Sequence, residues 1–573
     1  MRNGEIAEAF EELASLYELD GAVVYRVVAY RNAAKAIREA GGSVAELARQ
    51  GRAEELAGVG KTIAEKIDAL LEGGSIPSAD KLKQRIPPGL VEVTRIPGLG
   101  PKRARMLHEH LGVASIDDLR RAAEDGSLKD VAGFGRKAEE NVLAALAAGA
   151  DGRPKARVLL SKALTVGEEL VATLRDHPAA LRVELAGSAR RSADTVKDLD
   201  IVVASSDPAA LVEAFAGLNA IDTVSTSGEA GAKAVTHSGL PVDLRIVPEE
   251  AFGNLLQHFT GSGKHNEALR TEAVRRGLHV SEYGIADDDS GESHPFATEE
   301  EVYERLGMRY IPPELRENRG ELEAAREGRL PDLIELDDIR GDLHMHTTLS
   351  DGHASVEEMA SAARELGYGY VAITDHSATH GFGDDVQPNA LRRRIEEIRD
   401  LGDLGITVLA GTETNVLPDG SLDYADDLLE ELDWVIASLH TSFRLSEKKQ
   451  TERMLRAMEH PLVDAIGHPT GRLIERREPY ALDLDRVIAK AVETGTFLEV
   501  NANPDRRDLN DVYARAAAEA GATLVIDSDA HWPRTLQNMR YGLATARRAW
   551  LTAGQVANTR PWAELAELRK RGR

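Results

Sequence analysis

The sequence of 573 residues contains no cysteine. This excludes disulfides, thiolate nucleophiles and Cys-type zinc sites, so any bound metal must be held by His, Asp and Glu. No apolar run is long enough to cross a bilayer. The first twenty residues are acidic and amphipathic, without the basic start and apolar stretch of a secretory signal. We therefore expect a cytoplasmic protein without a membrane partner.

An excess of positive charge is also missing, because 96 Asp and Glu residues outnumber 70 Lys and Arg residues and give a net charge of −26. This argues at first against a nucleic-acid partner, since phosphate contacts need Lys and Arg. Residues 1–150 are nearly neutral, however, with 21 basic and 23 acidic residues. Carboxylates that bind metal cations also add to the acidic count without repelling DNA. Net charge therefore decides little.

The pattern of the chain changes several times, as expected for roughly four domains at about 150 residues each. Up to about residue 150, apolar residues recur three and four apart, which predicts short helices. From about residue 181, runs with a period of two alternate with helical stretches and predict a mixed α/β unit. Residues 313–339 are charge-dense and indicate a linker or a solvated helix. After residue 341, apolar strands alternate with helices, as in a parallel α/β barrel.

The strands predicted for this barrel end in polar residues, among them six of the 17 histidines. Side chains at the carboxyl ends of barrel strands gather in one place. A single His there more often satisfies a core hydrogen bond, but a set of nine ligands favours a cluster of two or three divalent ions. A set of imidazole nitrogen and carboxylate oxygen ligands favours Mn²⁺, and Zn²⁺ and Fe²⁺ are the alternatives. The candidates are His344, His346, Asp351, His376, Glu413, His440, His468, Asp529 and His531.

The segments that carry these residues read HMHTTLSDG, TDHS, TET, SLHTS, GHPTG and DSDAH. They resemble the motifs of the PHP (polymerase and histidinol phosphatase) domain. The resemblance covers residues 340–573 and implies a distorted (β/α)₇ barrel with a trinuclear metal site that hydrolyses phosphoesters. It also implies that the nine residues are the metal ligands.

A second group of carboxylates lies in the middle of the chain. Asp198 and Asp200 are two residues apart before a β-branched run, so both face one side of a strand, and Asp243 opens a strand that could pair beside it. Such a set can hold two Mg²⁺ or Mn²⁺ ions, one activating a hydroxyl and one bridging the phosphates of a nucleotide. The alternative is a solvated strand edge. Donors suited to phosphate lie upstream, at Gly187, Ser188 and Arg191.

A Gly-x-Gly turn recurs three times in the N-terminal part, each time before a helix with a basic residue. Such a turn points backbone N–H groups at a positive helix end, where a DNA phosphate can bind. A single copy is more often an ordinary turn between helices, but three copies resemble helix-hairpin-helix motifs and favour binding to the DNA backbone. The residues concerned are Gly58, Gly60, Lys61, Gly98, Gly100, Lys102, Gly133, Gly135 and Arg136.

From residue 1 to about residue 312, the chain is similar to family X DNA polymerases, and the segment HFTGSGKHNEALR at 258–270 strengthens the resemblance. The implied fold is multidomain α and α/β, with helical helix-hairpin-helix domains, a nucleotidyltransferase palm and the PHP barrel. The implied domains are an N-terminal lyase-like helical domain (1–88), fingers (89–150), palm (151–250), thumb (251–312), linker (313–339) and PHP domain (340–573).

The resemblance also implies roles for single residues of the palm and thumb. His258 and Phe259 stand in place of the family's Tyr-Phe pair, so the wall beside the 2′ carbon of the sugar differs. Pro241 replaces an Arg of vertebrate members, which affects proton handling at the primer hydroxyl. The residues matched to the nucleotide-binding positions are His258, Phe259, Gly261, Ser262, Asn266 and Arg270.

The segment AGVGKTIAEKIDALL is similar to the lyase helix of family X enzymes, where a Lys forms a Schiff base with a sugar aldehyde. Lys66 is the matching position, although Thr62 stands where the vertebrate pattern has a second Lys, and a plain solvated Lys is the alternative. Tyr30 and Arg31 match the helix that binds the 5′-phosphate.

Together these patterns predict a DNA-directed DNA polymerase that fills short gaps in base excision repair or end joining. The barrel is expected to be a 3′-5′ exonuclease with an additional abasic-site endonuclease activity. The expected partners are gapped or nicked double-stranded DNA and deoxynucleoside triphosphates, and the expected working form is a monomer in the bacterial cytoplasm, associated with the nucleoid through DNA. The alternatives are a DNA-end-binding scaffold in which only the barrel is active, and a small-molecule phosphatase with a DNA tether.

Overall fold

The computed structural model of the chain divides into two compact units. One unit comprises Met1–Val158, Lys162–Leu185 and Val196–Phe252, and the other Leu159–Ser161, Ala186–Thr195 and Gly253–Arg573. The structure describes all residues except 23, 41, 57, 95, 97, 98, 132, 133, 136–138, 140, 141, 144, 145, 147–156, 382–384 and 573. None of the described helices combines the length and apolar character needed to span a bilayer.

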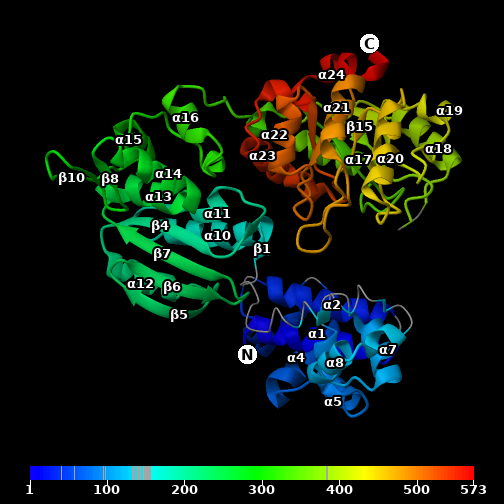
Figure 1. The fold of residues 1–573 in the computed structure, drawn as a ribbon, viewed down its shortest axis with the longest axis horizontal. Helices are drawn as coiled ribbons and strands as arrows, with labels where there is room; N and C mark the ends of the chain where they lie inside the picture. The colour runs from blue at the N-terminus through cyan, green and yellow to red at the C-terminus, as the bar shows by residue number, and fades with distance from the viewer. Residues whose placement is uncertain are drawn as a thin grey trace. The chain divides into compact units, whose positions relative to one another are not determined.

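The N-terminal part is helical, as its apolar spacing predicts (Figure 1). Its helices bury one apolar cluster, in which Phe10 and Leu13 of the first helix are fully buried. Glycines end two helices in the left-handed conformation, Gly74 at φ 74° and Gly112 at φ 68°. The helices are α1 (Asn3–Leu19), α2 (Val24–Glu39), α3 (Val44–Arg49), α4 (Lys61–Gly73), α5 (Pro77–Lys83), α6 (Pro88–Val93), α7 (Pro101–Leu111) and α8 (Ile116–Glu124).

A five-stranded sheet follows, with strand order β2-β4-β7-β6-β5. The central strands β4 and β7 are parallel and their other neighbours are antiparallel. Helix α10 (Leu160–Arg175) approaches the sheet at Gly167, where an added Cβ would lie 3.0 Å from Leu185. The strands are β2 (Ala180–Leu185), β4 (Leu199–Ser205), β5 (Ile221–Gly228), β6 (Gly231–Thr236) and β7 (Pro241–Val247), with helix α12 (Pro208–Ala216) between β4 and β5.

The next segment is built from helices and a small antiparallel sheet of order β10-β9-β8. Residues 313–339, which the sequence analysis interprets as a linker or solvated helix, are partly packed instead. Leu315, Ala325 and Leu333 join the same apolar cluster as Tyr303. The elements are α11 (Gly187–Arg190), α13 (Phe252–Thr260), α14 (Gly263–Val274), β8 (Leu278–Val280), β9 (Ile285–Asp287), β10 (Ser293–His294), α15 (Glu299–Arg305) and α16 (Glu321–Arg326).

The C-terminal part is a parallel seven-stranded sheet in the order β11 to β17. It nearly closes, because Met345 bridges to Ala530 and the backbone N of His346 donates to the carbonyl of Ala530 at 2.8 Å. This confirms the predicted distorted (β/α)₇ barrel, coloured green to red in Figure 1. Its strands are β11 (Gly341–Met345), β12 (Tyr370–Ile373), β13 (Thr407–Asn415), β14 (Trp434–Ser438), β15 (Ala465–Ile466), β16 (Phe497–Asn501) and β17 (Leu524–Asp527).

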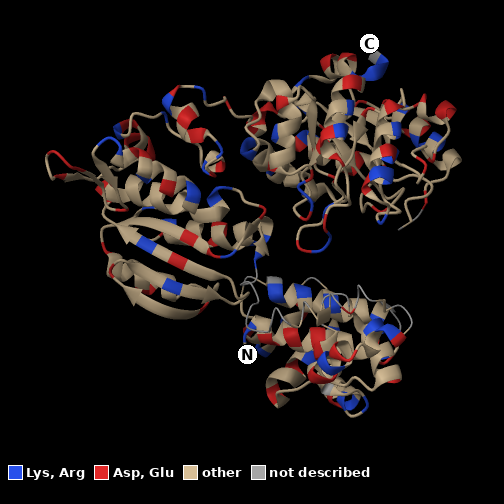
Figure 2. Ribbon diagram, viewed as in Figure 1, with Lys and Arg blue, Asp and Glu red and all other residues tan. Residues whose placement is uncertain are grey.

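Helices cover the outside of this barrel, and a second cluster that includes Leu343, Trp434 and Phe497 is buried apart from the main core. Basic and acidic residues are interspersed on the helices of each part of the chain (Figure 2). The barrel helices are α17 (Val356–Glu365), α18 (Pro388–Arg399), α19 (Asp426–Leu429), α20 (Glu447–Glu459), α21 (Leu484–Thr494), α22 (Asp511–Glu519), α23 (Met539–Arg548) and α24 (Trp562–Leu568).

Candidate metal centre and nucleotide-binding residues

The ligands predicted for the barrel converge at the carboxyl ends of its strands. Among the described residues, three groups have ligand atoms that all lie within 4.8 Å of one another. His346 belongs to two groups and His376 to two, so the groups adjoin. The groups are His346, Asp351, His376 and His531; His344, His346 and Asp529; and His376, Glu413 and His440. Such adjoining groups fit a cluster of ions better than a single ion.

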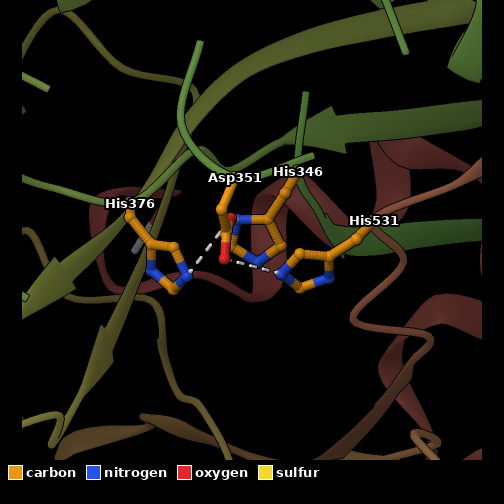
Figure 3. Close-up of side chains that lie close together, drawn as sticks. All are labelled: His346, Asp351, His376 and His531. Carbon is orange, nitrogen blue, oxygen red and sulfur yellow. Dashed lines mark ion pairs between the residues drawn. The ribbon is translucent and has the colours of Figure 1, made fainter. Parts of the chain in front are cut away.

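Asp351 lies between two imidazoles at the outer side of the centre (Figure 3). Its Oδ1 is 3.6 Å from Nε2 of His376, and its Oδ2 is 3.3 Å from Nε2 of His531. Gly352, the next residue, is required there, because an added Cβ would lie 2.5 Å from the backbone of His346. The loop after β11 therefore brings Asp351 back over the strand end from which His346 projects.

Glu413, on β13, lies at the inner side of the centre. Its carboxylate is 2.8 Å from Nδ1 of His376, 3.2 Å from Nε2 of His440 and 2.8 Å from Nε2 of His468. His468 is not a member of the three groups, but this contact places it with them. All nine predicted ligands thus lie in one connected cluster.

The electrostatics of the cluster fit cations. Burial lowers the pKa of His440 to about 4, which leaves a neutral imidazole that can bind a metal. Burial acts in the same direction on His376, but the carboxylates of Glu413 and Asp351 outweigh it and raise the pKa of this imidazole to about 10. The negative charge of these two carboxylates is the charge that bound cations would neutralise.

Unsatisfied polar atoms support the same conclusion. Within the described part of the chain, both ring nitrogens of His346 are buried without a hydrogen-bond partner of suitable geometry. Yet Nε2 of His346 faces Oδ1 of Asp529 at 3.2 Å. A buried polar atom left unpaired costs roughly 1–3 kcal/mol. Divalent ions between these lone pairs would remove the cost, and the donor set of imidazole and carboxylate suits Mn²⁺, Zn²⁺ or Fe²⁺.

Three further residues belong to this centre in addition to the nine predicted from the sequence. Glu499, fully buried on β16, accepts a hydrogen bond of 2.6 Å from Nδ1 of His344. Asn501 donates to both Glu499 and Asp529, at 3.1 Å each. A cavity of about 390 Å³ is lined by several of the predicted ligands and also by Arg506. Nε of Arg506 is 3.4 Å from the carboxylate of Asp529. For Glu499 and Asn501, the signal available in the sequence is a Glu and an Asn inside the apolar run FLEVNAN.

The central carboxylates are brought together by strand pairing. Asp200 on β4 and Asp243 on β7 are direct partners in the register of these parallel strands, and Asp198 precedes Asp200 by two residues. Asp243 is held by basic residues, since Nη2 of Arg245 donates to it at 3.0 Å and Nζ of Lys233 lies 3.8 Å away. Among the described residues, these three carboxylates are not one of the groups with ligand atoms all within 4.8 Å.

The residues matched to the nucleotide-binding segment are mostly engaged in local structure. Nδ2 of Asn266 donates to the carbonyl of His258 at 2.6 Å, which satisfies the end of α13. Gly261 permits this contact, because an added Cβ would lie 2.2 Å from the Asn266 side chain. Ser262 caps α14, accepting from the backbone N of His265 at 3.1 Å. Arg270 is exposed, and burial lowers the pKa of the half-buried His258, whose ring lies 5.5 Å from that of Phe259.

The predicted phosphate donors follow β2 in the chain. Gly187 has φ 61° and begins the short helix α11 with Ser188. The guanidinium of Arg191 is already bonded, with Nε at 3.0 Å from Glu317 and Nη1 donating to the carbonyl of Thr260 at 2.9 Å. A nucleotide phosphate would therefore have to compete with Glu317 for Arg191.

In the N-terminal helices, Gly60 and Gly100 are the N-cap residues of α4 and α7, and Gly58 has φ 85°. No side chain of these N-cap residues accepts from the first N–H groups of α4 and α7, and exposed Lys61 and Lys102 lie beside them. Gly135 is also exposed. Gly98, Gly133 and Arg136 lie outside the described residues.

The other predicted residues of the N-terminal helices differ in their accessibility. Lys66 is half-buried on α4, next to buried Ile67. Tyr30 is only 7% exposed and stacks on Tyr17 with ring centroids 5.4 Å apart, so its ring packs in the core. Exposed Arg31 forms an ion pair with Glu18.

Comparison with known families assigns the parts of the chain. The chain matches the helix-hairpin-helix domain over residues 1–76, the SAM-like helix-hairpin-helix tandem over 90–148, the DNA polymerase beta thumb over 255–317 and the PHP domain over 342–503. It is 38% identical over 575 aligned residues to the DNA polymerase/3′-5′ exonuclease PolX of Bacillus subtilis (strain 168), and the alignment covers 100% of both chains.

The C-terminal part has relatives of its own. It is 31% identical over 237 residues to a probable phosphatase of Thermoanaerobacter sp. (strain X514), which covers 38% of this chain and 89% of the relative. It is 32% identical over 246 residues to a probable phosphatase of Shewanella sediminis (strain HAW-EB3), covering 40% of this chain and 94% of the relative. The barrel is therefore similar to proteins that consist of little else.

Proposed function

Since the chain belongs to the PolX family of DNA polymerases with 3′-5′ exonuclease activity, we propose that it fills short gaps in DNA repair and trims 3′ ends with its barrel. The observation that carries this proposal is the presence, in one chain, of paired carboxylates on a five-stranded sheet and of a separate His-rich centre in the barrel. The first suits nucleotidyl transfer and the second suits phosphodiester hydrolysis.

For the polymerase reaction, Asp198, Asp200 and Asp243 are the proposed ligands of two Mg²⁺ or Mn²⁺ ions. When bound, these ions would lower the pKa of the primer hydroxyl and bind the triphosphate. Arg245 holds Asp243 in place through two contacts. Ser188 and Arg191 are the proposed donors to the phosphates, with Arg191 offering a charged fork. His258, Phe259 and Arg270 remain the proposed contacts to sugar and base.

For the exonuclease reaction, the nine barrel residues are the proposed ligands of two or three ions, with Mn²⁺ favoured and Zn²⁺ or Fe²⁺ as alternatives. When bound, the ions would supply a hydroxide nucleophile and neutralise the leaving oxygen. The chain's own groups orient the ligands, because Glu499 fixes the imidazole of His344 and Asn501 fixes Asp529. Cleavage at abasic sites is a second proposed activity of the same centre.

For substrate binding, we propose that the helix ends capped by Gly60 and Gly100 bind DNA phosphates without reading sequence. The proposed substrate is gapped or nicked double-stranded DNA with deoxynucleoside triphosphates, bound by a monomer in the cytoplasm. Lys66 is a candidate for a lyase step. The division into domains at residues 88, 150, 250, 312 and 339 is part of this proposal.

A single experiment tests both sites. A duplex with a one-nucleotide gap and a 5′-labelled primer is incubated with the full chain and Mn²⁺, with and without deoxynucleotides, and primer length is read on a gel. We expect extension by one nucleotide with deoxynucleotides and shortening without them. Shortening alone would favour the scaffold with an active barrel, and extension alone would contradict the exonuclease assignment.

A further inference from the structure

Two loops that carry proposed metal ligands each place an aromatic ring beside the centre. His353 follows Asp351 by two residues, and Trp532 directly follows His531. The two rings stack on each other, with centroids 4.1 Å apart and planes inclined by 23°. The stack is therefore attached to the centre from both loops.

The backbone around this stack is fixed. The backbone N of His353 donates to the carbonyl of His531 at 2.9 Å. Oγ1 of Thr535 accepts from the backbone N of Trp532 at 3.1 Å and donates to its carbonyl at 2.8 Å. Thr535 and His531 line the cavity of about 390 Å³ that holds the metal ligands. These bonds hold Trp532 beside two residues that line that cavity, His531 and Thr535.

The ring of Trp532 is unusual for this barrel, because it is 40% exposed while that of Trp434 is fully buried. It makes no contribution to the apolar clusters of the described residues. The exposed guanidinium of Arg534 lies 5.1 Å from its ring centroid. An exposed aromatic ring with a neighbouring cation is the combination with which proteins bind single-stranded nucleic acid.

We propose that Trp532 stacks on the base of the unpaired 3′-terminal nucleotide and so positions the last phosphodiester at the metal centre. This inference rests on the proposed exonuclease function. His353 supports the ring from one side, and Arg534 leaves the ring to contact a backbone phosphate, because an exposed cation–π contact is weak. Every base has a π face, so the contact is independent of sequence. It requires an unpaired end, which gives frayed or mismatched ends an advantage over paired ones.

The contact can be measured by fluorescence without relying on turnover. A single-stranded oligonucleotide carries 2-aminopurine at its 3′ end and a phosphorothioate at the last linkage to slow cleavage, and it is titrated with the full chain in Mn²⁺. We expect quenching of the 2-aminopurine on binding to the wild type and to Trp532→Phe. Trp532→Ala should lose most of the quenching and bind about fivefold or more weakly. Tyr513→Ala, at an exposed aromatic residue on helix α22, is the matched control.

The kinetic test compares a normal 3′-terminal nucleotide with an abasic one. The wild type should prefer the normal end by about fivefold or more in kcat/KM, and Trp532→Ala should reduce this ratio towards one. The two kcat/KM values are compared within the same variant. Any effect of the substitution on the neighbouring ligand His531 lowers both values alike and does not change their ratio. An unchanged ratio and unchanged quenching in Trp532→Ala would overturn the proposal.

Hydrolysis of bis(p-nitrophenyl) phosphate, which has no base, separates this inference from the proposed function. If the wild type hydrolyses this ester but does not shorten DNA, the exonuclease function fails. If it shortens normal and abasic ends equally well, the exonuclease function stands and the stacking role of Trp532 is wrong.

Discussion

Nη1 of Arg548, on helix α23 of the barrel, donates a hydrogen bond of 2.7 Å to the backbone carbonyl of Arg191. The same guanidinium binds Glu317 at 2.9 Å, and Glu317 in turn binds the side chain of Arg191. Its Nη2 lies 2.9 Å from Asp511. Four charged residues of distant chain segments thus form one network, in which a barrel residue supports a residue proposed to bind the incoming nucleotide.

We predict that Arg548→Ala weakens both folding and nucleotide binding. Arg548 is 8% exposed, and its removal takes one of two arginine partners from Glu317, which keeps Arg191, and one from Asp511, which keeps Arg319. Because each carboxylate keeps a second arginine, we expect a loss of about 1.5–3 kcal/mol, the value of a hydrogen bond to a charged group. Thermal unfolding should show the loss of stability, and steady-state incorporation should show a higher KM for deoxynucleotide. Arg486→Ala, which removes an exposed ion pair with Glu452, is the control and should change neither. An unchanged KM would limit Arg548 to a structural role.

Glu299 gives a prediction on pH. Burial opposes its ionisation, but Arg316 and Arg190 outweigh burial and lower the pKa of this carboxyl from 4.5 to about 2. Because the folded-state pKa is below the unfolded one, the stabilisation is present above about pH 4.5 and is lost as the pH falls towards 2. The shift corresponds to about 3 kcal/mol in the free energy of unfolding.

Denaturant unfolding between about pH 5 and pH 3 checks this prediction. Glu299→Gln should be less stable at pH 5 and should lose part of the pH dependence of the wild type. Its exposed neighbour on α15, Glu300, provides the control, since Glu300→Gln should leave the pH dependence as it is. Equal slopes for wild type and Glu299→Gln would contradict the assignment.

The two active sites are predicted to lose activity separately. Asp200→Asn should lower nucleotide incorporation by about 100-fold or more while 3′-end shortening persists, and His440→Ala should do the reverse, because each removes a proposed metal ligand. Primer extension and primer shortening are measured with the same gapped duplex. Controls are Asp222→Asn on β5 and His460→Ala after α20, which pair with His237 and Asp426 instead. Loss of both activities in either ligand variant would show that the sites depend on each other.

Local sequence patterns were sufficient for much of this structure. Polar residues at the ends of apolar strands predicted the barrel and the convergence of its ligands, since barrel geometry fixes where strand ends lie. The two-residue spacing of Asp198 and Asp200 and a second strand with Asp243 predicted the carboxylate pairing observed in the register of β4 and β7.

Contacts that depend on tertiary packing were not predictable in this way. Arg548 and Arg191 are 357 residues apart in the chain, and no local periodicity joins them. Tyr30 matched a phosphate-binding helix by its position, but stacking on Tyr17 turns its ring into the core. Residues 313–339 looked solvated because of their charge, yet Arg316 and Glu321 are fully buried and are paired with Glu299 and His265 of other elements.

Glu499 supplies the last prediction. Its Oε1 accepts from Nδ1 of His344, and its Oε2 accepts from the side chain of Asn501 and from the backbone N of His468. Glu499→Gln keeps the shape but replaces one of the two acceptor oxygens by an N–H donor, so the orientation of His344 or of the His468 loop is lost. Mutation of a residue that orients a metal ligand through a hydrogen bond typically lowers metal affinity or activity about 10–100-fold.

We therefore expect Glu499→Gln to bind Mn²⁺ about 10–100-fold more weakly in a calorimetric titration, with exonuclease activity recovering at high Mn²⁺. Recovery distinguishes this positioning role from that of a ligand, because removal of a ligand such as Asp529 also deletes a coordination position that added metal cannot replace. Glu493→Gln, at an exposed residue of α21, is the matched control. If Mn²⁺ affinity stays unchanged in Glu499→Gln, the orientation of His344 does not limit metal binding, and the buried carboxylate serves the barrel fold instead.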